Sequence, residues 1–254
     1  MFRYKTQHDL DSPARTLQHR EIILRKAFLR KLYDEWYGIF EKEVSKLPEG
    51  KIVELGSGGG YLKDILPDVI TSDILELPHV DMVFSALEMP FGDKELSGLF
   101  TLDTFHHIPD SHAFLKEAGR VLKPGGKMIM IEPANSWWGR LIYKNFHHEP
   151  FDEKGSWQIP STGPMSGANG ALPWIVFMRD RERFAKEFPG LRIEKISRHT
   201  PLRYLLSGGV SFRSLVPSWS FGFFRAIDKI LAGISGQFSM FMTVVVVKRN
   251  VETP

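Results

Sequence analysis

A glycine-rich turn carries the clearest chemical signal in this chain. It follows the apolar residues Ile52 and Val53 and contains Gly56, Gly58 and Gly60, with Glu54 two places before the first glycine. Glycines let a backbone approach a ligand more closely than any other residue would permit. The turn therefore predicts a bound nucleoside-like cofactor.

Two histidine-rich segments supply the other candidates for chemistry. His106 and His107 follow an apolar segment, and His147, His148 and Glu149 lie together further along the chain. A histidine titrates near neutral pH, which suits a base that takes a proton from an acceptor. We take His106, His107 and His148 as candidate catalytic residues. The alternative for the first pair is that one ring packs against the loop and caps it.

The same histidines and acids could in principle bind a metal ion. However, His147 and His148 are adjacent, and with Glu149 and Asp152 they match no dedicated spacing of metal ligands. We therefore expect a polar loop that contacts substrate, and no metal site.

The glycine spacing separates two classes of cofactor. A dinucleotide fingerprint that starts at Gly56 requires a glycine at position 61, where this chain has Tyr61. A nicotinamide-dependent oxidoreductase is disfavoured for that reason. The segment instead reads E-x-G-x-G-x-G, which resembles motif I of class I S-adenosylmethionine-dependent methyltransferases.

Four later segments resemble the same family in the same order. They are Thr71–Asp73, Ser85–Phe91, Leu102–Ile108 and Gly119–Pro133. The likeness covers roughly residues 50–133 and is greatest to the methyltransferase type 11 branch, which includes quinone-biosynthesis enzymes.

The resemblance implies S-adenosylmethionine as the cofactor and indicates which residues hold it. Asp73 would accept hydrogen bonds from the ribose hydroxyls, while Asp103 and Thr104 would line the methionine side. Ser85 stands where the family pattern has an aspartate beside the adenine, so the adenine amine would rely on backbone carbonyls or a hydroxyl. The full predicted set is Glu54, Gly56, Ser57, Gly58, Gly60, Asp73, Ile74, Ser85, Ala86, Asp103 and Thr104.

The implied reaction is direct methyl transfer to a small or lipid-linked acceptor, at oxygen in preference to carbon or nitrogen. Quinone-like precursors and cell-envelope glycan intermediates are the leading acceptor classes, and both come from the resemblance. The alternative function is a catalytically silent S-adenosylmethionine-binding scaffold or partner subunit.

Alternating apolar strands and amphipathic helices must position these residues. The pattern predicts strands at 51–55, 69–72, 81–84, 98–102, 127–132, 191–197 and 242–248, helices near 60–66 and 112–121, and one helix or two over 20–46. Such a rhythm indicates an α/β fold with helices on both faces of the sheet and ligands at the carboxyl ends of its strands. The resemblance implies a Rossmann-like, seven-stranded, mostly parallel sheet in the order 3-2-1-4-5-7-6.

We divide the chain into an N-terminal helical extension, 1–50, and a methyltransferase domain, 51–254. The domain carries a substrate-side loop at 133–175 and an insertion at 198–240, before the last strand. The insertion is aromatic and basic, which would suit a membrane interface, a cap over an apolar pocket or core packing. The uncharged run from Ile230 to Val247 reads better as helix, turn and strand than as a membrane span, because glycines and polar residues interrupt it.

The amino-acid composition limits the chemistry, the location and the partners of the protein. The 254 residues include no cysteine, which excludes disulfides and thiolate chemistry and fits a reducing compartment. The formal net charge is +3, with basic residues in excess in 1–31 and 192–229 and acidic residues in excess between them. Residues 1–8 contain no apolar core of a signal peptide. We expect a cytoplasmic protein, with peripheral contact at the inner face of the membrane left open, and no nucleic-acid partner.

Overall fold

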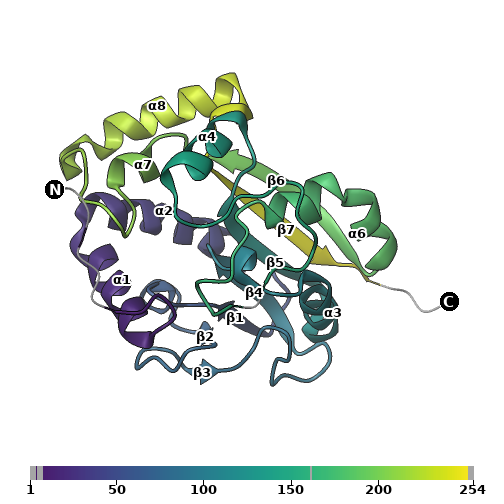
Figure 1. Cartoon of the computed structure of the whole chain (residues 1–254). Coiled ribbons are helices and arrows are strands. Elements are labelled where there is room, and N and C mark those ends of the chain that lie inside the picture. The colour runs from purple at the N-terminus through teal and green to yellow at the C-terminus, as the bar shows by residue number, and fades with distance from the viewer. Residues whose placement is uncertain (1–3, 5–7, 161, 251–254) are drawn as a thin grey trace.

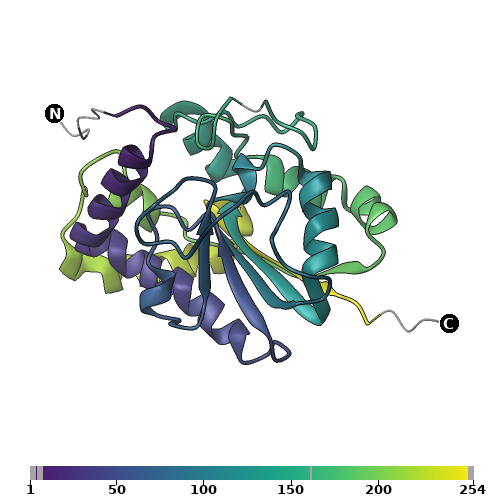
Figure 2. The ribbon, with the colours of Figure 1, turned by 90° about the horizontal axis from the view of Figure 1, so that it is seen from below.

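The computed structural model describes residues 4, 8–160 and 162–250, and these form one seven-stranded sheet flanked by helices (Figures 1 and 2). The strand order is β3-β2-β1-β4-β5-β7-β6, and β7 alone is antiparallel to its neighbours. This confirms the predicted Rossmann-like fold. The expectation of no signal peptide falls largely on residues outside the described part of the chain. The strands are β1 Lys51–Leu55, β2 Ile70–Asp73, β3 Met82–Val83, β4 Leu96–Leu102, β5 Leu122–Pro133, β6 Leu191–His199 and β7 Phe241–Lys248.

The helices lie on both faces of the sheet and across its carboxyl edge. None of the helices within the described ranges is long and apolar enough to cross a bilayer. The α-helices are α1 Pro13–Arg25, α2 Ala27–Val44, α3 Ser111–Val121, α4 Trp137–Phe146, α5 Leu172–Trp174, α6 Arg181–Glu187, α7 Arg203–Ser207 and α8 Phe221–Ile234.

The core forms around the central strands, which are apolar on both faces. Leu99 and Phe100 of β4 and Ile129 of β5 are fully buried, as expected for parallel strands covered by helices on both sides. The α2 helix adds its apolar stripe to this core, and the ring of Phe40 stacks on that of Phe100 with centroids 4.8 Å apart. The N-terminal extension is therefore packed into the same core as the sheet.

Two local predictions differ from the structure in detail. The helix expected near 60–66 is a single 3-10 turn, Leu62–Asp64. Only six residues separate Gly60 from Pro67, which is less than two helical turns. The loop expected at 133–175 includes α4 and α5, whereas the segment at 20–46 is two helices, which is one of the two predicted forms. The uncharged run from Ile230 to Val247 is the end of α8, a turn and β7, as predicted.

Lys26 explains why the N-terminal helix breaks in two. Its backbone is extended between α1 and α2, and its side chain is buried. The Lys26 ammonium donates hydrogen bonds to the carbonyl oxygens of Gly209 at 2.5 Å and Phe212 at 2.7 Å. Burial lowers the pKa of Lys26 to about 8. The break thus lets the N-terminal extension hold the insertion in place over the sheet edge.

Candidate active site

A cavity of about 930 Å³ lies at the carboxyl ends of β1, β2 and β4. That volume is at the upper end of the range for small-molecule sites. Its walls come from the glycine turn, from α1 and α2, from the loops after β4 and α4, and from α7 with the segment that follows it. Residues 204–205, 208–212 and 215 of the insertion line this cavity, and we call the segment 204–215 the cap. The outer face of α8 remains exposed.

Each glycine of the turn meets a separate constraint. Gly56 has a φ of +64°, and a β-carbon there would lie 2.3 Å from Cγ2 of Thr104. Gly58 has a φ of +44°, which side-chain-bearing residues rarely adopt. A β-carbon on Gly60 would lie 2.4 Å from the hydroxyl of Tyr37. The turn is held from outside by His79, whose Nε2 lies 2.7 Å from the Gly58 carbonyl oxygen.

Asp73 stands at the end of β2 with both carboxylate oxygens directed at backbone donors. Oδ2 accepts a hydrogen bond from Gly58 N and Oδ1 from Leu75 N, each at 2.9 Å. Burial raises the pKa of Asp73, while these donors act in the opposite direction. Each oxygen keeps a lone pair for a further donor, which suits a pair of vicinal hydroxyls.

Two other carboxyl groups face the cavity without a full set of partners. Glu54 is 2% exposed, and its Oε2 has no hydrogen-bond partner in the described structure. Burial raises the pKa of Glu54 to about 8, and the neighbouring charge of Asp73 adds to this effect. Burial likewise raises the pKa of Asp103, to about 7, against the opposing charge of His106. A ligand ammonium group would match both carboxyls.

The remaining predicted cofactor residues also line this cavity. Ile74 is exposed, and the Ser85 hydroxyl accepts a hydrogen bond from Leu87 N at 3.2 Å. Thr104 lies against Gly56, with its hydroxyl 3.3 Å from the Gly56 carbonyl oxygen. The structure thus gathers all eleven residues in one place, including Gly56, Ser57, Gly58, Gly60 and Ala86.

His106 is held between two carboxylates. Its Nδ1 lies 2.7 Å from Oε2 of Glu132, and its Nε2 lies 3.2 Å from Oε2 of Glu149. These two acids hold the pKa of His106 well above its usual value, although burial acts to lower it. An imidazolium in such a clamp has no lone pair to accept a proton, so the arrangement favours a positioning role for His106 over that of a base.

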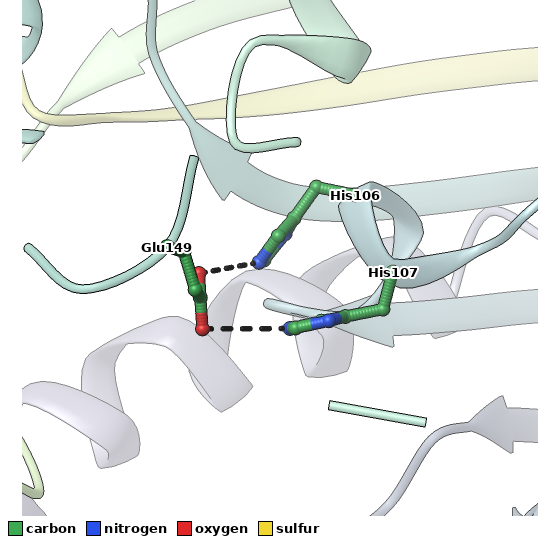
Figure 3. Close-up of side chains that lie close together, drawn as sticks. All are labelled: His106, His107 and Glu149. Atoms are coloured by element: carbon green, nitrogen blue, oxygen red, sulfur yellow. Dashed lines mark hydrogen bonds and ion pairs between the residues drawn. The ribbon is translucent and has the colours of Figure 1, made fainter. Parts of the chain in front are cut away.

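His107 presents its other nitrogen to the cavity. Its Nδ1–H donates to the carbonyl oxygen of Gly167 at 3.0 Å, since a carbonyl can only accept. Its Nε2 is then free of a proton and lies 3.7 Å from Oε1 of Glu149 (Figure 3). Burial lowers the pKa of His107 to about 4, and the charge on His106 adds to this. His107 is therefore neutral at pH 7.

Glu149 is the centre of the histidine cluster. Besides His106 and His107, it has His147 Nδ1 and His148 Nε2 within 3.7 Å of its carboxylate oxygens. The surrounding imidazoles hold the pKa of Glu149 far below its usual value, although burial acts to raise it. Among them His148 is the most exposed, at 41% of its side chain.

Nothing in the sequence indicated directly that several further residues line the cavity. His19 on α1, Tyr33 on α2 and Tyr204 on α7 all line it, and their role depends on how distant helices pack. Glu132 could have been identified from the sequence. It lies at the carboxyl end of β5, and ligands of such sheets bind at the carboxyl ends of the strands, which is also the reason for choosing Asp103. Its position beside the end of β4 follows from the predicted strand order.

The roof of the cavity joins the two flanks of the sheet. The backbone of Arg20 on α1 lies against Gly59 of the turn. Asp11, just before α1, accepts hydrogen bonds at Oδ1 from Met165 N at 2.7 Å and from Ser166 N at 2.8 Å. The N-terminal segment and the loop after α4 therefore run side by side over the same end of the sheet (Figure 2).

Comparisons with known proteins agree with the site. Residues 53–130 match a family described as "methyltransferase domain". A ubiquinone/menaquinone biosynthesis C-methyltransferase of Rubrivivax gelatinosus is 32% identical over 81 residues, which cover 31% of this chain and 32% of that protein. The chloroplastic tocopherol O-methyltransferase of Arabidopsis thaliana is 37% identical over 49 residues, or 19% of this chain and 14% of that protein. The chain thus spans less than half the length of these relatives.

A solved structure supports the fold over nearly the whole chain. Geranyl diphosphate C-methyltransferase from Streptomyces coelicolor A3(2), in complex with S-adenosyl-L-homocysteine, has a TM-score of 0.51 and 13% identity. The similarity covers 96% of this chain and 85% of that chain. The matched segment and the sheet order together define the class, as predicted. The chain carries a class I S-adenosylmethionine-dependent methyltransferase domain.

Replacing Glu132 by glutamine tests whether this carboxylate holds the site together. Glu132 is 0% exposed and accepts hydrogen bonds from Thr104 N and Phe105 N at 3.0 and 2.8 Å, besides its pairing with His106. We expect Glu132→Gln to lower the free energy of unfolding by about 3 kcal/mol, because it removes one partner of a buried ion pair and leaves His106 with Glu149 alone. Urea denaturation measures this, with the exposed Glu88→Gln as control. Equal stability of the two variants would contradict the role of Glu132.

Proposed function

We propose that this protein transfers a methyl group from S-adenosylmethionine to an oxygen of a small or lipid-linked acceptor. The observation that carries the proposal is the composition of the cavity. One side of the cavity is lined by the glycine turn, Asp73 and Asp103, which would suit the nucleoside and amino-acid parts of the cofactor. The other side is apolar and carries His107 and Glu149. The methyl donor and the acceptor would thus lie in one cavity.

The cofactor would lie along the glycine turn. Asp73 would bind the ribose hydroxyls, and Glu54 with Asp103 would bind the ammonium group of the methionine moiety. Ile74 and Ala86 would contact the adenine. The orphaned Oε2 of Glu54 supports this placement, since a buried polar atom without a partner is uncommon in folded proteins.

The acceptor would enter beside the cap. The walls on that side are apolar and include Phe146, Leu205, Val210, Phe212 and Leu215. An aromatic or isoprenoid-like body would pack against them. Relatives named for quinone and tocopherol methylation support an acceptor of this kind.

Methyl transfer requires an acceptor atom about 3 Å from the methyl carbon and in line with the departing sulfur. In this protein the acceptor oxygen would lie near His107 and Glu149, which follow the methionine-side residues Asp103 and Thr104 into the cavity. Both would help to ionise the acceptor hydroxyl. His106 would act as a positioning residue that fixes Glu149, and His148 would contact the acceptor at the rim.

A cofactor test uses Gly58→Arg, which places a long cation in the turn at a φ that disfavours side chains. We expect the affinity for S-adenosylhomocysteine to fall at least about 100-fold, because the new side chain occupies the ligand's space. Isothermal titration calorimetry measures it. The control is Gly222→Arg, since Gly222 is exposed on α8 with open space around it. Unchanged binding by Gly58→Arg would refute the placement of the cofactor.

The raised pKa of Glu54 predicts a pH dependence of cofactor binding. A ligand ammonium group prefers the ionised carboxylate, whereas Glu54 holds its proton below about pH 8 in the free protein. Affinity for S-adenosylhomocysteine should therefore rise with pH, by up to about tenfold per unit, and level off near pH 8. In Glu54→Gln the remaining dependence should end near pH 7, where Asp103 titrates. A wild-type affinity that is flat from pH 6 to 8 would exclude Glu54 as the ammonium partner.

Peripheral contact with a membrane is the second part of the proposal. The α4 and α8 helices both pack against the turn Gly236–Phe238 and expose large apolar side chains (Figure 1). Arg140 on α4 and Lys229 on α8 place positive charge on the same helices, which suits anionic lipid. Lys144 and Arg225 pair with Glu153 and Glu35. The exposed apolar side chains are Trp137, Leu141 and Phe146 on α4, Trp219 in the turn before α8, and Phe223, Ile230 and Ile234 on α8.

Flotation with liposomes checks this contact. We expect the protein to float with vesicles that contain phosphatidylserine and not with vesicles of phosphatidylcholine alone. Phe223→Ser combined with Ile230→Ser should abolish flotation and keep the affinity for S-adenosylhomocysteine, because both residues lie outside the cavity walls. Failure of the wild type to bind anionic vesicles at low salt would exclude membrane contact.

A further inference from the structure

The geometry points to a divalent-cation site at the acceptor end of the cavity, with Nε2 of His106, Nε2 of His107 and the carboxylate of Glu149 as its ligands. This inference rests on the proposed function, because it states how the acceptor oxygen is ionised. The three side chains come from the turn after β4 and from the loop after α4 (Figure 3).

The ligand atoms have the separations that one cation requires. Nε2 of His106 lies 3.2 Å from Oε2 of Glu149, and Nε2 of His107 lies 3.7 Å from Oε1. All the ligand atoms of this triad lie within 4.8 Å of one another. Ligands about 2.1 Å from a shared cation are roughly 3.0–3.5 Å apart, so small side-chain movements would close the site.

The outer nitrogens of both rings are already fixed as they are in metal sites. A histidine that binds a metal through one nitrogen commonly donates the other N–H to a carboxylate or a backbone carbonyl. Here Nδ1 of His106 pairs with Glu132 at 2.7 Å, and Nδ1 of His107 donates to the Gly167 carbonyl at 3.0 Å. Both Nε2 atoms are thereby aimed at Glu149, and a bound cation would take the place of the Nε2 proton that His106 carries in the free protein. The orienting contacts exist without the cation.

A nearby unpaired nitrogen gives independent support. His19 on α1 is 8% exposed and lines the same cavity, and its Nε2 has no hydrogen-bond partner among the described residues. Electrostatic interactions with His148 and Glu149 place His19 close to the cluster. A buried imidazole nitrogen without a partner indicates that a ligand or water belongs there.

The ligand set narrows the choice of cation. Two imidazole nitrogens and one carboxylate oxygen suit Zn²⁺, Co²⁺, Mn²⁺ or Fe²⁺ better than Mg²⁺ or Ca²⁺, which prefer oxygen ligands. The sequence could not indicate this site from spacing, since His106 and Glu149 are 43 residues apart. Adjacent histidines alone had favoured a polar loop that contacts substrate.

The cation would bind the acceptor hydroxyl at an open coordination position and lower its pKa. The hydroxyl proton then passes to water. The oxygen forms a bond to the methyl carbon, and the carbon–sulfur bond breaks with its electron pair remaining on sulfur. His107 and Glu149 serve as ligands in this step, and no separate base is needed.

Direct metal binding tests the site without any acceptor. The full-length protein is stripped with a chelator, dialysed and titrated with Co²⁺ and Zn²⁺, followed by the visible spectrum of Co²⁺ and by competition with a chromophoric chelator. We expect one equivalent with a dissociation constant on the order of micromolar or tighter, and cobalt bands typical of nitrogen and oxygen ligands. No bound equivalent, or cobalt bands like those of the hexaaqua ion, would overturn the site.

Variants assign the ligands. His107→Gln and Glu149→Gln should each weaken Zn²⁺ binding at least about 100-fold, because a three-ligand set loses one member. The control is His112→Gln, which removes a histidine whose side chain is 49% exposed and paired with Glu187. Zn²⁺ affinity unchanged in both ligand variants would overturn the assignment. If either variant fails to fold, the wild-type cobalt spectrum decides alone.

S-adenosylhomocysteine affinity is measured on the same samples and separates the two proposals. Retained cofactor binding with no cation binding would remove the metal site and leave the proposed methyltransferase function intact. Loss of cofactor binding in the wild type would remove the proposed function itself.

Discussion

The buried carboxylate of Glu132 is the interaction on which the site depends. It stands at the end of β5 and accepts hydrogen bonds from Thr104 N, Phe105 N and the ring of His106. These contacts fix the turn that follows β4, including Asp103 at a φ of +56°. A non-glycine residue keeps such a φ only where its surroundings enforce it. The carboxyl group of Glu132 on the neighbouring strand therefore sets the backbone that presents Asp103, Thr104 and His107 to the cavity.

The same turn also defines the glycine loop. Thr104 lies so close to Gly56 that no β-carbon would fit, and Tyr37 sets a similar limit at Gly60. The turn at 103–107 thus constrains both the glycine turn and the two histidines, and the ion pair between Glu132 and His106 holds it in place. Because protein interiors are close-packed, a shift on one side is transmitted to the other.

The sequence predicted the parts of the molecule that depend on local pattern. The strands, the glycine turn, Asp73 and the insertion before β7 all follow from periodicity, from backbone freedom or from the family resemblance, and the structure brings the predicted cofactor residues to one cavity. The sequence did not indicate the break at Lys26, the place of His19 or the clamp on His106. Each of these depends on a contact between segments far apart in the chain, such as Lys26 and Gly209, which are 183 positions apart. Periodicity carries no information about such pairs.

The roof formed by the N-terminal segment and the loop after α4 has a kinetic consequence. Asp11 fastens it through two backbone hydrogen bonds, and Lys26 fastens the adjoining cap through two more. A spent cofactor that left past this roof would have to break one of these fastenings. Opening a lid is often slower than the chemical step it protects. The turnover number would then measure how fast a few hydrogen bonds at the rim open. Steady-state kinetics would not detect the rate of methyl transfer itself.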